Sequence, residues 1–280
     1  MTNIFITIFA YFIDKKFGEF SFIKHPVIYM GKLITFFEKR FYKDSICRGF
    51  LLTFFVVGVT TMGAVFISFL FSYLPLYLNI ILTSVLASTL IAHNMLKSAV
   101  KNVLDAKDQK QAISMLVSRD TKDLTPSEIY KASIETYSEN LSDGVIAPMF
   151  YLVLFGFVGI VFYKTINTLD SMVGYRNEKY EKFGKVSALT DDVLNFVPSR
   201  LTAIIIMLIA KQKNIFAFYK DGKKHQSPNA GHPITAMAIA CNVTLGGDTS
   251  YFGKIQKKAT FGNGKKNITK KDVLKALKVI

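Results

Sequence analysis

Hydrophobic residues in this chain gather into a few long uncharged segments separated by polar and basic stretches. Between Gly49 and Ala92, 44 consecutive residues carry no Lys, Arg, Asp or Glu. A transmembrane helix needs about 20 apolar residues, and Pro75 interrupts the segment where it would break a helix. The pattern therefore predicts two membrane-spanning helices, near Phe50–Tyr73 and Leu76–Ala92, joined by a tight turn.

Three further apolar segments are shorter or less clean. Met1–Ile13 has 13 residues and lacks the basic start of a signal peptide, which predicts a shallow or partial span. Val145–Tyr163 has 19 uncharged residues and is long enough to cross. Phe196–Ala210 is short and contains Pro198 and Arg200, which argues against a full crossing.

The remaining sequence also has helical patterns. His93–Val117 is amphipathic, and Thr125-Pro126-Ser127-Glu128 combines a capping residue, a proline at the first position and a glutamate at the third, so a helix should run from there toward Asn140. Asn263–Lys266 predicts a loop, and Ile268–Ile280 a short basic amphipathic helix. The expected fold is an all-α, multi-span membrane protein, with an anchor region at residues 1–92 and a motif-bearing catalytic region, with partly inserted helices, at 93–280.

Composition narrows the function classes. Half of the residues are hydrophobic and the net charge is +15. Nucleic-acid modules interleave aromatic and basic residues on a polar scaffold, a pattern missing here, so we expect no nucleic-acid partner. The chain has 8 Lys or Arg in Asp14–Arg48, 7 in His93–Gly144 and 14 after Ala210, against none in Ser72–Leu76. Basic loops stay in the cytoplasm, which predicts a cytoplasmic-membrane protein with these stretches inside.

Polar side chains concentrate in four short blocks, each next to an apolar segment: Glu135–Gly144, Asn167–Tyr175, Thr190–Arg200 and Ser227–Pro233. In the first block, Glu135 and Glu139 would share a helix face, where like charges destabilise each other unless a cation lies between them. A solvent-exposed helix end, with Asp143-Gly144 as a turn, is the alternative interpretation.

The second block follows the apolar segment Val145–Tyr163. Helical spacing would place Asn167, Asp170 and Ser171 on one face. An acid and an amide at the mouth of a membrane segment suit Mg²⁺ or a polar substrate. A helix cap built from Asn and Asp is the simpler alternative.

The third block pairs the adjacent carboxylates Asp191 and Asp192 with Asn195 near the same face. These acids could simply complement a helix dipole. Arg200, however, lies in an apolar stretch, where an unpaired guanidinium is costly. We therefore expect an anionic partner for Arg200, either Asp191, Asp192 or a substrate phosphate.

The fourth block is a turn by composition, with Asn229 and His232 ahead of the apolar stretch Ile234–Leu245. A single histidine is more often structural than catalytic. Other sources of chemistry are missing from the sequence: it has no HExxH, GxSxG or paired CxxC motif, and Cys47 and Cys241 match no metal spacing or disulfide framework.

Taken in order, the blocks resemble the CobD/CbiB family of adenosylcobinamide-phosphate synthases in cobalamin biosynthesis. The matching strings are Ser138-Glu139-Asn140, Asp143 to Pro148, Asn167 to Tyr175, Asp191-Asp192 with Asn195, Pro198 and Arg200, and Ser227 to Pro233, preceded by Asp14, Gly18, His25-Pro26-Val27 and Gly31. The resemblance covers Asp14 to Gly253. Where the family usually has Gly-Asp-Pro, this chain has Gly18-Glu19-Phe20.

The resemblance implies an ATP-dependent ligase. It would join a propionate carboxylate of adenosylcobyric acid to 1-amino-2-propanol or its phosphate, with Mg²⁺ as cofactor. The implied metal or phosphate-site residues are Asp170, Asp191 and Asp192, and Arg200 would contact phosphate. Asn167, Asn229 and His232 would orient substrate or move a proton, and the other expected substrate contacts are Glu139, Asn140, Asp143, Ser171 and Asn195.

Two other function classes remain open at this point. One is a membrane transferase acting on a lipid or isoprenoid phosphate, which would use the same acids and arginine. The other is a non-catalytic membrane subunit that docks soluble corrin enzymes through its basic loops. Expected partners are the corrinoid and amine substrates, membrane lipid, and either a second copy of the chain or other corrin-pathway enzymes.

Charge counting creates one conflict in the expected topology. A full crossing by Val145–Tyr163 would place Lys164–Val197, with its acids, outside the cell. That loop carries five Lys or Arg, which argues against export. Pro148 and the Gly156/Gly159 pair suggest re-entrant or half-inserted helices instead, which are tolerated where they line a cavity or are buried in protein.

Overall fold

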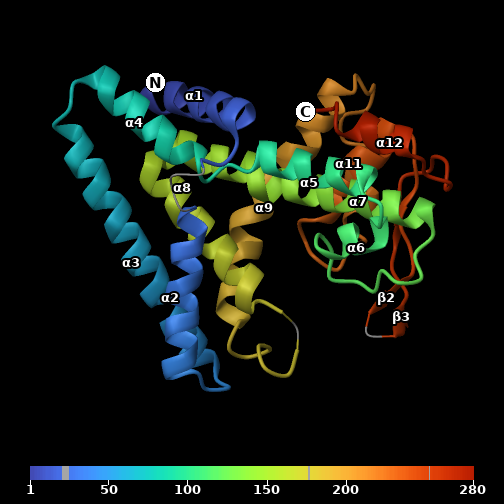
Figure 1. The fold of residues 1–280 in the computed structure, drawn as a ribbon, viewed down its shortest axis with the longest axis horizontal. Coiled ribbons are helices and arrows are strands. Elements are labelled where there is room, and N and C mark those ends of the chain that lie inside the picture. The colour runs from blue at the N-terminus through green and yellow to red at the C-terminus, as the bar shows by residue number, and fades with distance from the viewer. Residues whose placement is uncertain (21–24, 176, 252) are drawn as a thin grey trace. The chain divides into compact units, whose positions relative to one another are not determined.

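The fold is described here from a computed structural model, which covers residues 1–20, 25–175, 177–251 and 253–280 (Figure 1). Four helical segments in this part of the chain are long and apolar enough to cross a membrane: Ile46–Ser72, Leu76–Asp105, Pro126–Val173 and Lys185–Ile209. Strands are confined to four short pieces. The predicted class, a helical multi-span membrane protein, is confirmed.

Two compact units make up the chain, and each is built from two separate stretches of sequence. Unit 1 contains Met1–Asn94 and Ala147–Asn195, and unit 2 contains Met95–Ile146 and Phe196–Ile280. These units are defined by packing. The predicted division into an anchor before residue 93 and a catalytic region after it concerns function, and stays a prediction.

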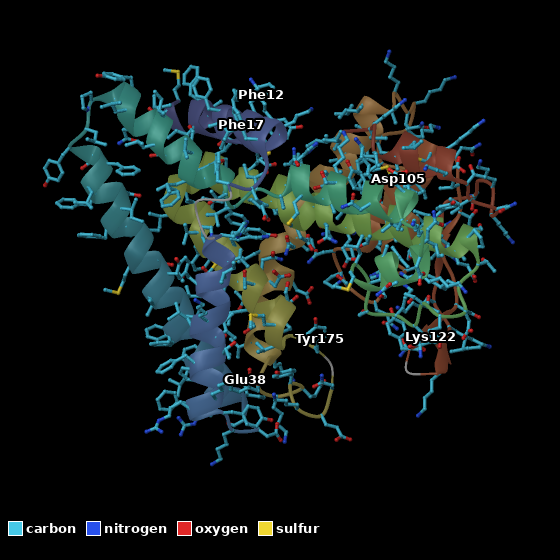
Figure 2. The ribbon with its side chains drawn as sticks, in the orientation of Figure 1. Phe12, Phe17, Glu38, Asp105, Lys122 and Tyr175 are labelled. Atoms are coloured by element: carbon cyan, nitrogen blue, oxygen red, sulfur yellow. The ribbon has the colours of Figure 1, made fainter. Side chains whose placement is uncertain are left out.

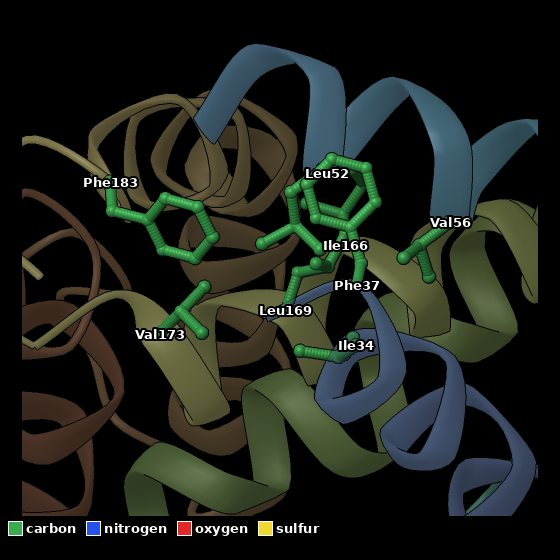
Figure 3. Packing of buried hydrophobic residues seen from close by; sticks show 8 residues of the cluster. All are labelled: Ile34, Phe37, Leu52, Val56, Ile166, Leu169, Val173 and Phe183. Atoms are coloured by element: carbon green, nitrogen blue, oxygen red, sulfur yellow. The ribbon is translucent and has the colours of Figure 1, made fainter. Parts of the chain in front are cut away.

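Unit 1 contains α1 (Thr2–Phe17), α2 (Pro26–Phe41), α3 (Ile46–Ser72), α4 (Leu76–Ser88) and α8 (Ala147–Val173). Helix α8 packs against α1, α2, α3 and α4, and α1 lies along α4. Figure 3 shows the core where α2, α3 and α8 meet, built from Ile34, Phe37, Leu52, Val56, Ile166, Leu169, Val173 and Phe183.

Hydrogen bonds between small polar side chains add to this packing. Thr165 on α8 donates to Thr60 on α3 at 2.9 Å, and Thr53 on α3 lies 3.0 Å from Ser187. Hydroxyl groups of this kind commonly join helices inside membranes, because they find partners without water. The first of these contacts joins α8 to α3, and the second joins α3 to the start of the helix at Lys185–Ile209.

The predicted hairpin between the first two spans is confirmed. Helix α3 ends at Ser72 and α4 begins at Leu76, directly after Pro75. The side-chain amide of Asn79 donates to the carbonyl of Phe71 at 2.8 Å and satisfies one of the free carbonyls at the end of α3. Helix α1 has 16 residues and is not among the four candidate spans.

The segment from α7 to α8 is continuous but irregular. Helix α7 (Pro126–Leu141) begins with the predicted capping box, in which Thr125 and Glu128 bond each other's backbone. A π-helical turn, η1 (Ser142–Ile146), leads into α8, which is broken at Gly156 with φ 65° and ψ −155°. Next to the break, Asn3 of α1 donates to the carbonyl of Val153 at 3.3 Å.

The apolar stretch Phe196–Ala210, expected to be too short for a full crossing, belongs to α9 (Lys185–Ile209), which is a candidate span by length and composition alone. The helix starts at Lys185, ahead of the polar third block, so a search for apolar runs misses its first turns. One sequence expectation needs correction. The amphipathic segment His93–Val117 forms two helices, α5 (His93–Asp105) and α6 (Gln109–Ser114), because Asp108 caps a new helix by accepting from the N–H of Gln111.

Unit 2 also contains α10 (Phe218–Gly222), α11 (Gly231–Cys241) and α12 (Lys270–Ala276), with α11 packed against α7, α10 and α12. Four short strands were not predicted: β1 (Leu245–Gly246) pairs antiparallel with β4 (Thr260–Phe261), and β2 (Thr249–Tyr251) with β3 (Lys254–Gln256). The predicted C-terminal helix is confirmed, but it is shorter than Ile268–Ile280.

Asp14 ties α1 to the start of α5. Its carboxylate accepts the N–H groups of His93 at 2.9 Å and Asn94 at 3.2 Å. Burial raises the pKa of Asp14 to about 6, while these N–H donors act in the opposite direction. A raised pKa means that the folded protein holds this proton more tightly than the unfolded chain, so stability from this group is lost as the pH rises through 6.

We therefore expect Asp14→Asn, which keeps an oxygen acceptor, to flatten the pH dependence of stability. In detergent, the wild-type melting temperature should fall between pH 5 and pH 7 by more than that of the variant. Equal slopes for both proteins would mean that Asp14 ionises as it does in the unfolded chain.

Candidate functional site

The second and third polar blocks meet in unit 1. Asn167 of α8 donates to Oδ1 of Asp191 at 3.5 Å, and Asn195 donates to Oδ2 at 2.9 Å. The Asp191 side chain is buried, with 8% of the residue exposed, so its carboxylate is held between two amides away from water. Three residues that the sequence predicted as site residues are thus brought into one hydrogen-bonded group.

The charges of Asp170 and Asp192 act on Asp191 in this group. Both residues are half-buried, and the charge of Asp170 acts on both Asp191 and Asp192. We call Asp170, Asp191 and Asp192 with the amides Asn167 and Asn195 the acidic cluster. Three carboxylates that repel one another in a partly dry environment attract a cation.

The donors of the acidic cluster are carboxylate oxygens, a ligand type that Mg²⁺ binds. Among the described residues, no three His, Cys, Asp or Glu side chains are arranged to hold a metal ion by themselves. Mg²⁺ usually takes only one or two carboxylates and completes its shell with water and substrate phosphates. The cluster fits that shared mode of binding and does not form an all-protein cage.

Two members of the network were missed by the sequence analysis. Tyr163, fully buried, donates to Oδ1 of Asn195 at 2.8 Å, and Lys164 donates to Oδ1 of Asn167 at 3.1 Å. Both residues end the apolar segment that precedes the second block. Their spacing was the signal that could have identified them: Tyr163 and Lys164 lie one helical turn before Asn167, on the same side of the helix. They orient the amides so that both NH₂ groups face Asp191.

Gly174 leaves room for the Asp170 carboxylate. Its N–H closes the end of α8 by donating to the carbonyl of Asp170 at 2.7 Å, and a Cβ at this position would collide with the Asp170 side chain. We expect Gly174→Ala to displace that carboxylate and lower catalytic activity by about tenfold or more, since a small misplacement of a catalytic group costs that much.

The matched controls are Gly58→Ala and Gly63→Ala on α3, where an added Cβ would meet nothing within 4 Å. These should leave activity unchanged and slightly favour the helix. Activity per folded protein, measured after checking the melting temperature, tests the prediction. A Gly174→Ala protein as active as the two controls would remove Asp170 from the site.

Arg200 lies in unit 2 and contacts the fourth block. Its Nη1 donates to the carbonyl of Phe196 at 2.7 Å and to Oδ1 of Asn229 at 3.3 Å, and Nη2 approaches the carbonyl of Pro228 at 3.4 Å. The guanidinium also stacks over the Phe196 ring at 3.6 Å. Of the partners that the sequence left open, no carboxylate in the described chain forms an ion pair with Arg200.

His232, the other member of the fourth block, is almost completely buried at the start of α11. Both ring nitrogens lack a hydrogen-bond partner in the described structure, and the ring stacks on Tyr219 with centroids 5.4 Å apart. Burial, and then the charges of Arg200 and Lys223, lower the pKa of His232 to about 4. The imidazole is therefore neutral near pH 7, with two buried nitrogens whose hydrogen-bonding capacity the described residues do not use.

The first block has a largely structural role at Glu135. This buried carboxylate pairs with Arg119 at 2.7 Å and accepts the N–H of Gly246 at 2.6 Å, so it joins α7 to β1. Arg119 thus supplies a cation to Glu135, the buried member of the Glu135/Glu139 pair. Of the predicted substrate contacts, Glu139 and Asn140 are exposed at the end of α7 and Asp143 is half-buried in η1.

Ser171 was predicted to share the site face of α8. It is exposed, and its hydroxyl donates to the carbonyl of Asn167 at 2.8 Å, one turn earlier in the helix. This bond is local to α8. It does not join Ser171 to the carboxylates of the acidic cluster.

Comparison with known proteins gives a consistent assignment. A family profile described as CobD/Cbib protein matches residues 7–280. The cobalamin biosynthesis protein CobD of Halalkalibacterium halodurans is 36% identical over 97% of this chain and 90% of its own length. The corresponding protein of Clostridium perfringens is 37% identical over 98% and 92%.

An archaeal relative extends the match. The probable cobalamin biosynthesis protein CobD of Pyrococcus furiosus is 40% identical over 84% of this chain and 82% of its own length. No solved structure matches the chain. With a family profile and full-length relatives in agreement, this chain belongs to the CobD/CbiB family of cobalamin-biosynthesis proteins.

Proposed function

We propose that the chain catalyses the ATP-dependent amide ligation that joins aminopropanol, free or phosphorylated, to a propionate side chain of adenosylcobyric acid. The observation that carries the proposal is the acidic cluster on α8 and α9, in a chain of this family, with the Asp191 carboxylate oriented by the amides of Asn167 and Asn195. Such pre-orientation is typical of a site that binds charged groups, because it removes the cost of reorganising the site during reaction.

The proposed chemistry needs two steps. A carboxylate is a poor electrophile, so ATP first converts it to an acyl phosphate or an acyl adenylate, releasing ADP or pyrophosphate. The amine nitrogen then attacks the acyl carbon, the amide C–N bond forms, and phosphate or AMP leaves. The amine must lose protons during attack, and the phosphoryl group carries negative charge throughout.

Mg²⁺ bound with ATP would neutralise the phosphate charge. The residues that would hold it are Asp170, Asp191 and Asp192, with the phosphates supplying further oxygens. Lys164, next to Asn167, is a cation in the same network that can bind a phosphate oxygen. Arg200, which forms no ion pair with a carboxylate in the part of the chain that the structure describes, would bind a transferring phosphate through its planar guanidinium.

His232 fits an orienting role better than that of a strong base. A pKa of about 4 keeps the ring neutral and a weak acceptor of protons near pH 7. A neutral imidazole donates from one nitrogen and accepts at the other. We propose that it hydrogen-bonds a substrate, together with Asn229.

Product formation by the purified chain tests the proposal. Protein in detergent, given Mg²⁺, ATP, adenosylcobyric acid and either aminopropanol or its phosphate, should form the amide, detected by mass spectrometry. Chelation of Mg²⁺ should stop the reaction. Corrin-dependent ATP consumption separates the ligase from a lipid-phosphate transferase and from a docking subunit. No product from well-folded protein with either amine would refute the proposal.

The site must face the cytoplasm, because ATP is there. The loop after α8 packs on the connection between α2 and α3: Lys179 pairs with Glu38 at 2.6 Å and Lys182 with Asp44 at 2.8 Å. Figure 2 labels Glu38 near the end of α2, where this contact forms. Charge counting places the α2–α3 connection inside the cell, so the loop after α8 should lie inside as well.

We therefore predict that a single cysteine at Lys179, in a chain whose Cys47 and Cys241 have been replaced, reacts with a membrane-impermeant thiol reagent only from the cytoplasmic side. The Lys179 side chain is 56% exposed, so the reagent can reach this position, and loss of a surface ion pair costs little stability. Labelling in intact cells would place the loop outside and contradict the proposed topology.

A further inference from the structure

Unit 2 has an open cavity that none of the polar blocks predicted. Its volume is about 640 Å³, and its lining residues are Phe216, Tyr219, Lys220 and Lys223. All four come from α10 or from the residues around it, shortly after the end of α9. The cavity combines aromatic walls with two ammonium groups, a pairing that suits an organic molecule carrying negative charge.

Among the described residues, no ion pair balances the two lysines that line this cavity. In the described chain, no carboxylate forms an ion pair with Lys220 or Lys223, whereas the neighbouring Lys224 pairs with Asp221 at 2.7 Å. Lys223 instead lies over the Tyr219 ring, with its Nζ 4.2 Å from the centroid. Two unpaired lysines side by side repel each other, and an anion between them would remove that cost.

Tyr219 connects the cavity to the fourth polar block. Its ring is stacked on His232, whose two ring nitrogens have no hydrogen-bond partner among the described residues, and Tyr219 is near enough to Arg200 to act on it electrostatically. The cavity lysines, Arg200 and His232 therefore surround a single tyrosine. A phosphate group needs several N–H donors and positive charges, and this arrangement supplies them from three separate segments.

We propose that the cavity binds the phosphate-bearing end of a small-molecule substrate, with Lys220 and Lys223 contacting the phosphate and Tyr219 positioning Arg200 and His232. The inference rests on the proposed function, which supplies two such molecules, ATP and the phosphorylated amine. Both present the same chemistry to the site. Phe216, which is 59% exposed, offers an aromatic face that only a nucleotide base would use.

Binding without turnover tests this site. The full-length chain, in nanodiscs of neutral phosphatidylcholine, is titrated calorimetrically with a non-hydrolysable ATP analogue, with aminopropanol phosphate and with unphosphorylated aminopropanol. The test variant is Lys220→Gln/Lys223→Gln. Its matched control is Lys224→Gln, which removes an exposed, ion-paired lysine from the same segment. Both lysines of the test variant are exposed, so the protein should fold, as melting temperatures will verify.

We expect the double variant to bind at least one phosphate compound about tenfold more weakly or worse, as loss of hydrogen bonds to a charged group predicts. The control should bind as the wild type does, and aminopropanol should show no difference between the proteins. The Phe216→Ala variant identifies the source: weaker binding of the ATP analogue alone indicates a nucleotide, and no change indicates the amine phosphate.

Unchanged binding of both phosphate compounds by the double variant would overturn the proposal. A further arm adds short-chain phosphatidylglycerol. If only this lipid binds differently to the variant, the lysines contact lipid headgroups and the proposal is wrong. If the wild type forms no amide but the double variant binds the phosphate compounds more weakly, the ligase proposal is refuted and the phosphate site is supported. If the wild type forms the amide but the double variant binds both phosphate compounds as the wild type does, the phosphate site is refuted and the ligase proposal is supported.

Discussion

Arg200→Lys is expected to lower kcat/KM for amide formation by about 2–4 kcal/mol of transition-state stabilisation, which is roughly 30- to 1000-fold. Lysine keeps the charge but not the planar fork that binds two phosphate oxygens at once. The present contacts of Arg200 are to carbonyl and amide oxygens, at 2.7 Å for Phe196 and 3.3 Å for Asn229. These orient the guanidinium without neutralising it.

The control for this substitution is Arg40→Lys at the exposed end of α2. It makes the same chemical change away from the site and should leave kcat/KM within about twofold of wild type, as surface changes usually do. Melting temperatures separate loss of catalysis from loss of folded protein. Near-full turnover by Arg200→Lys would show that the fork is not needed.

Asp191→Asn is expected to lower kcat/KM for amide formation about as much as Arg200→Lys does. It should also raise the Mg²⁺ concentration needed for half-maximal rate. The carboxylate accepts from two amides, and Tyr163 fixes one of them by bonding Asn195. An asparagine at 191 would present an NH₂ group to one of those donors. An unsatisfied buried donor costs about 1–3 kcal/mol, so stability should fall as well.

Asp192→Asn provides the comparison. Asp192 is only half-buried, so its variant should lose less stability while still raising the Mg²⁺ requirement. A Mg²⁺ titration of the initial rate for both variants measures this. If neither variant changed its Mg²⁺ dependence, the two carboxylates would only stabilise the start of the helix by complementing its dipole, the alternative given above.

Elements governed by local sequence were predicted well. The turn at Pro75 follows from the proline, and the start of α7 follows from Thr125 and Glu128, which bond within four residues. The length of α9 was underestimated because its first turns are polar and half-buried against α8. A continuous apolar run in the sequence indicates a helix that contacts lipid. Where a helix places polar residues against another helix, these residues interrupt the run, so that part of the helix is not detected.

The residues of the candidate site stay a prediction, and the sequence did not reveal which partners their side chains contact. The approach of Asn167 to Asp191 depends on how α8 packs against α9, and the pairing of Glu135 with Arg119 and Gly246 joins segments up to 111 residues apart. Spacing rules describe one element at a time and do not reach such contacts. The lysines around Tyr219 looked like part of the general basic charge after α9, because their lack of carboxylate partners is visible only in three dimensions.

The break in α8 at Gly156 has a consequence for how this chain enters the membrane. At 1.5 Å per residue, residues 147–155 reach only about 14 Å and residues 157–173 about 26 Å, against a hydrocarbon layer of about 30 Å. The break also frees backbone groups that lipid cannot solvate, and Asn3 satisfies one of them at Val153. Helix α1 is synthesised about 150 residues before that carbonyl, so Asn3 is already present when α8 is made. An amino-terminal fusion that displaces Asn3 would then impair insertion of the segment that carries Asp170, while the same fusion at the carboxyl end would not.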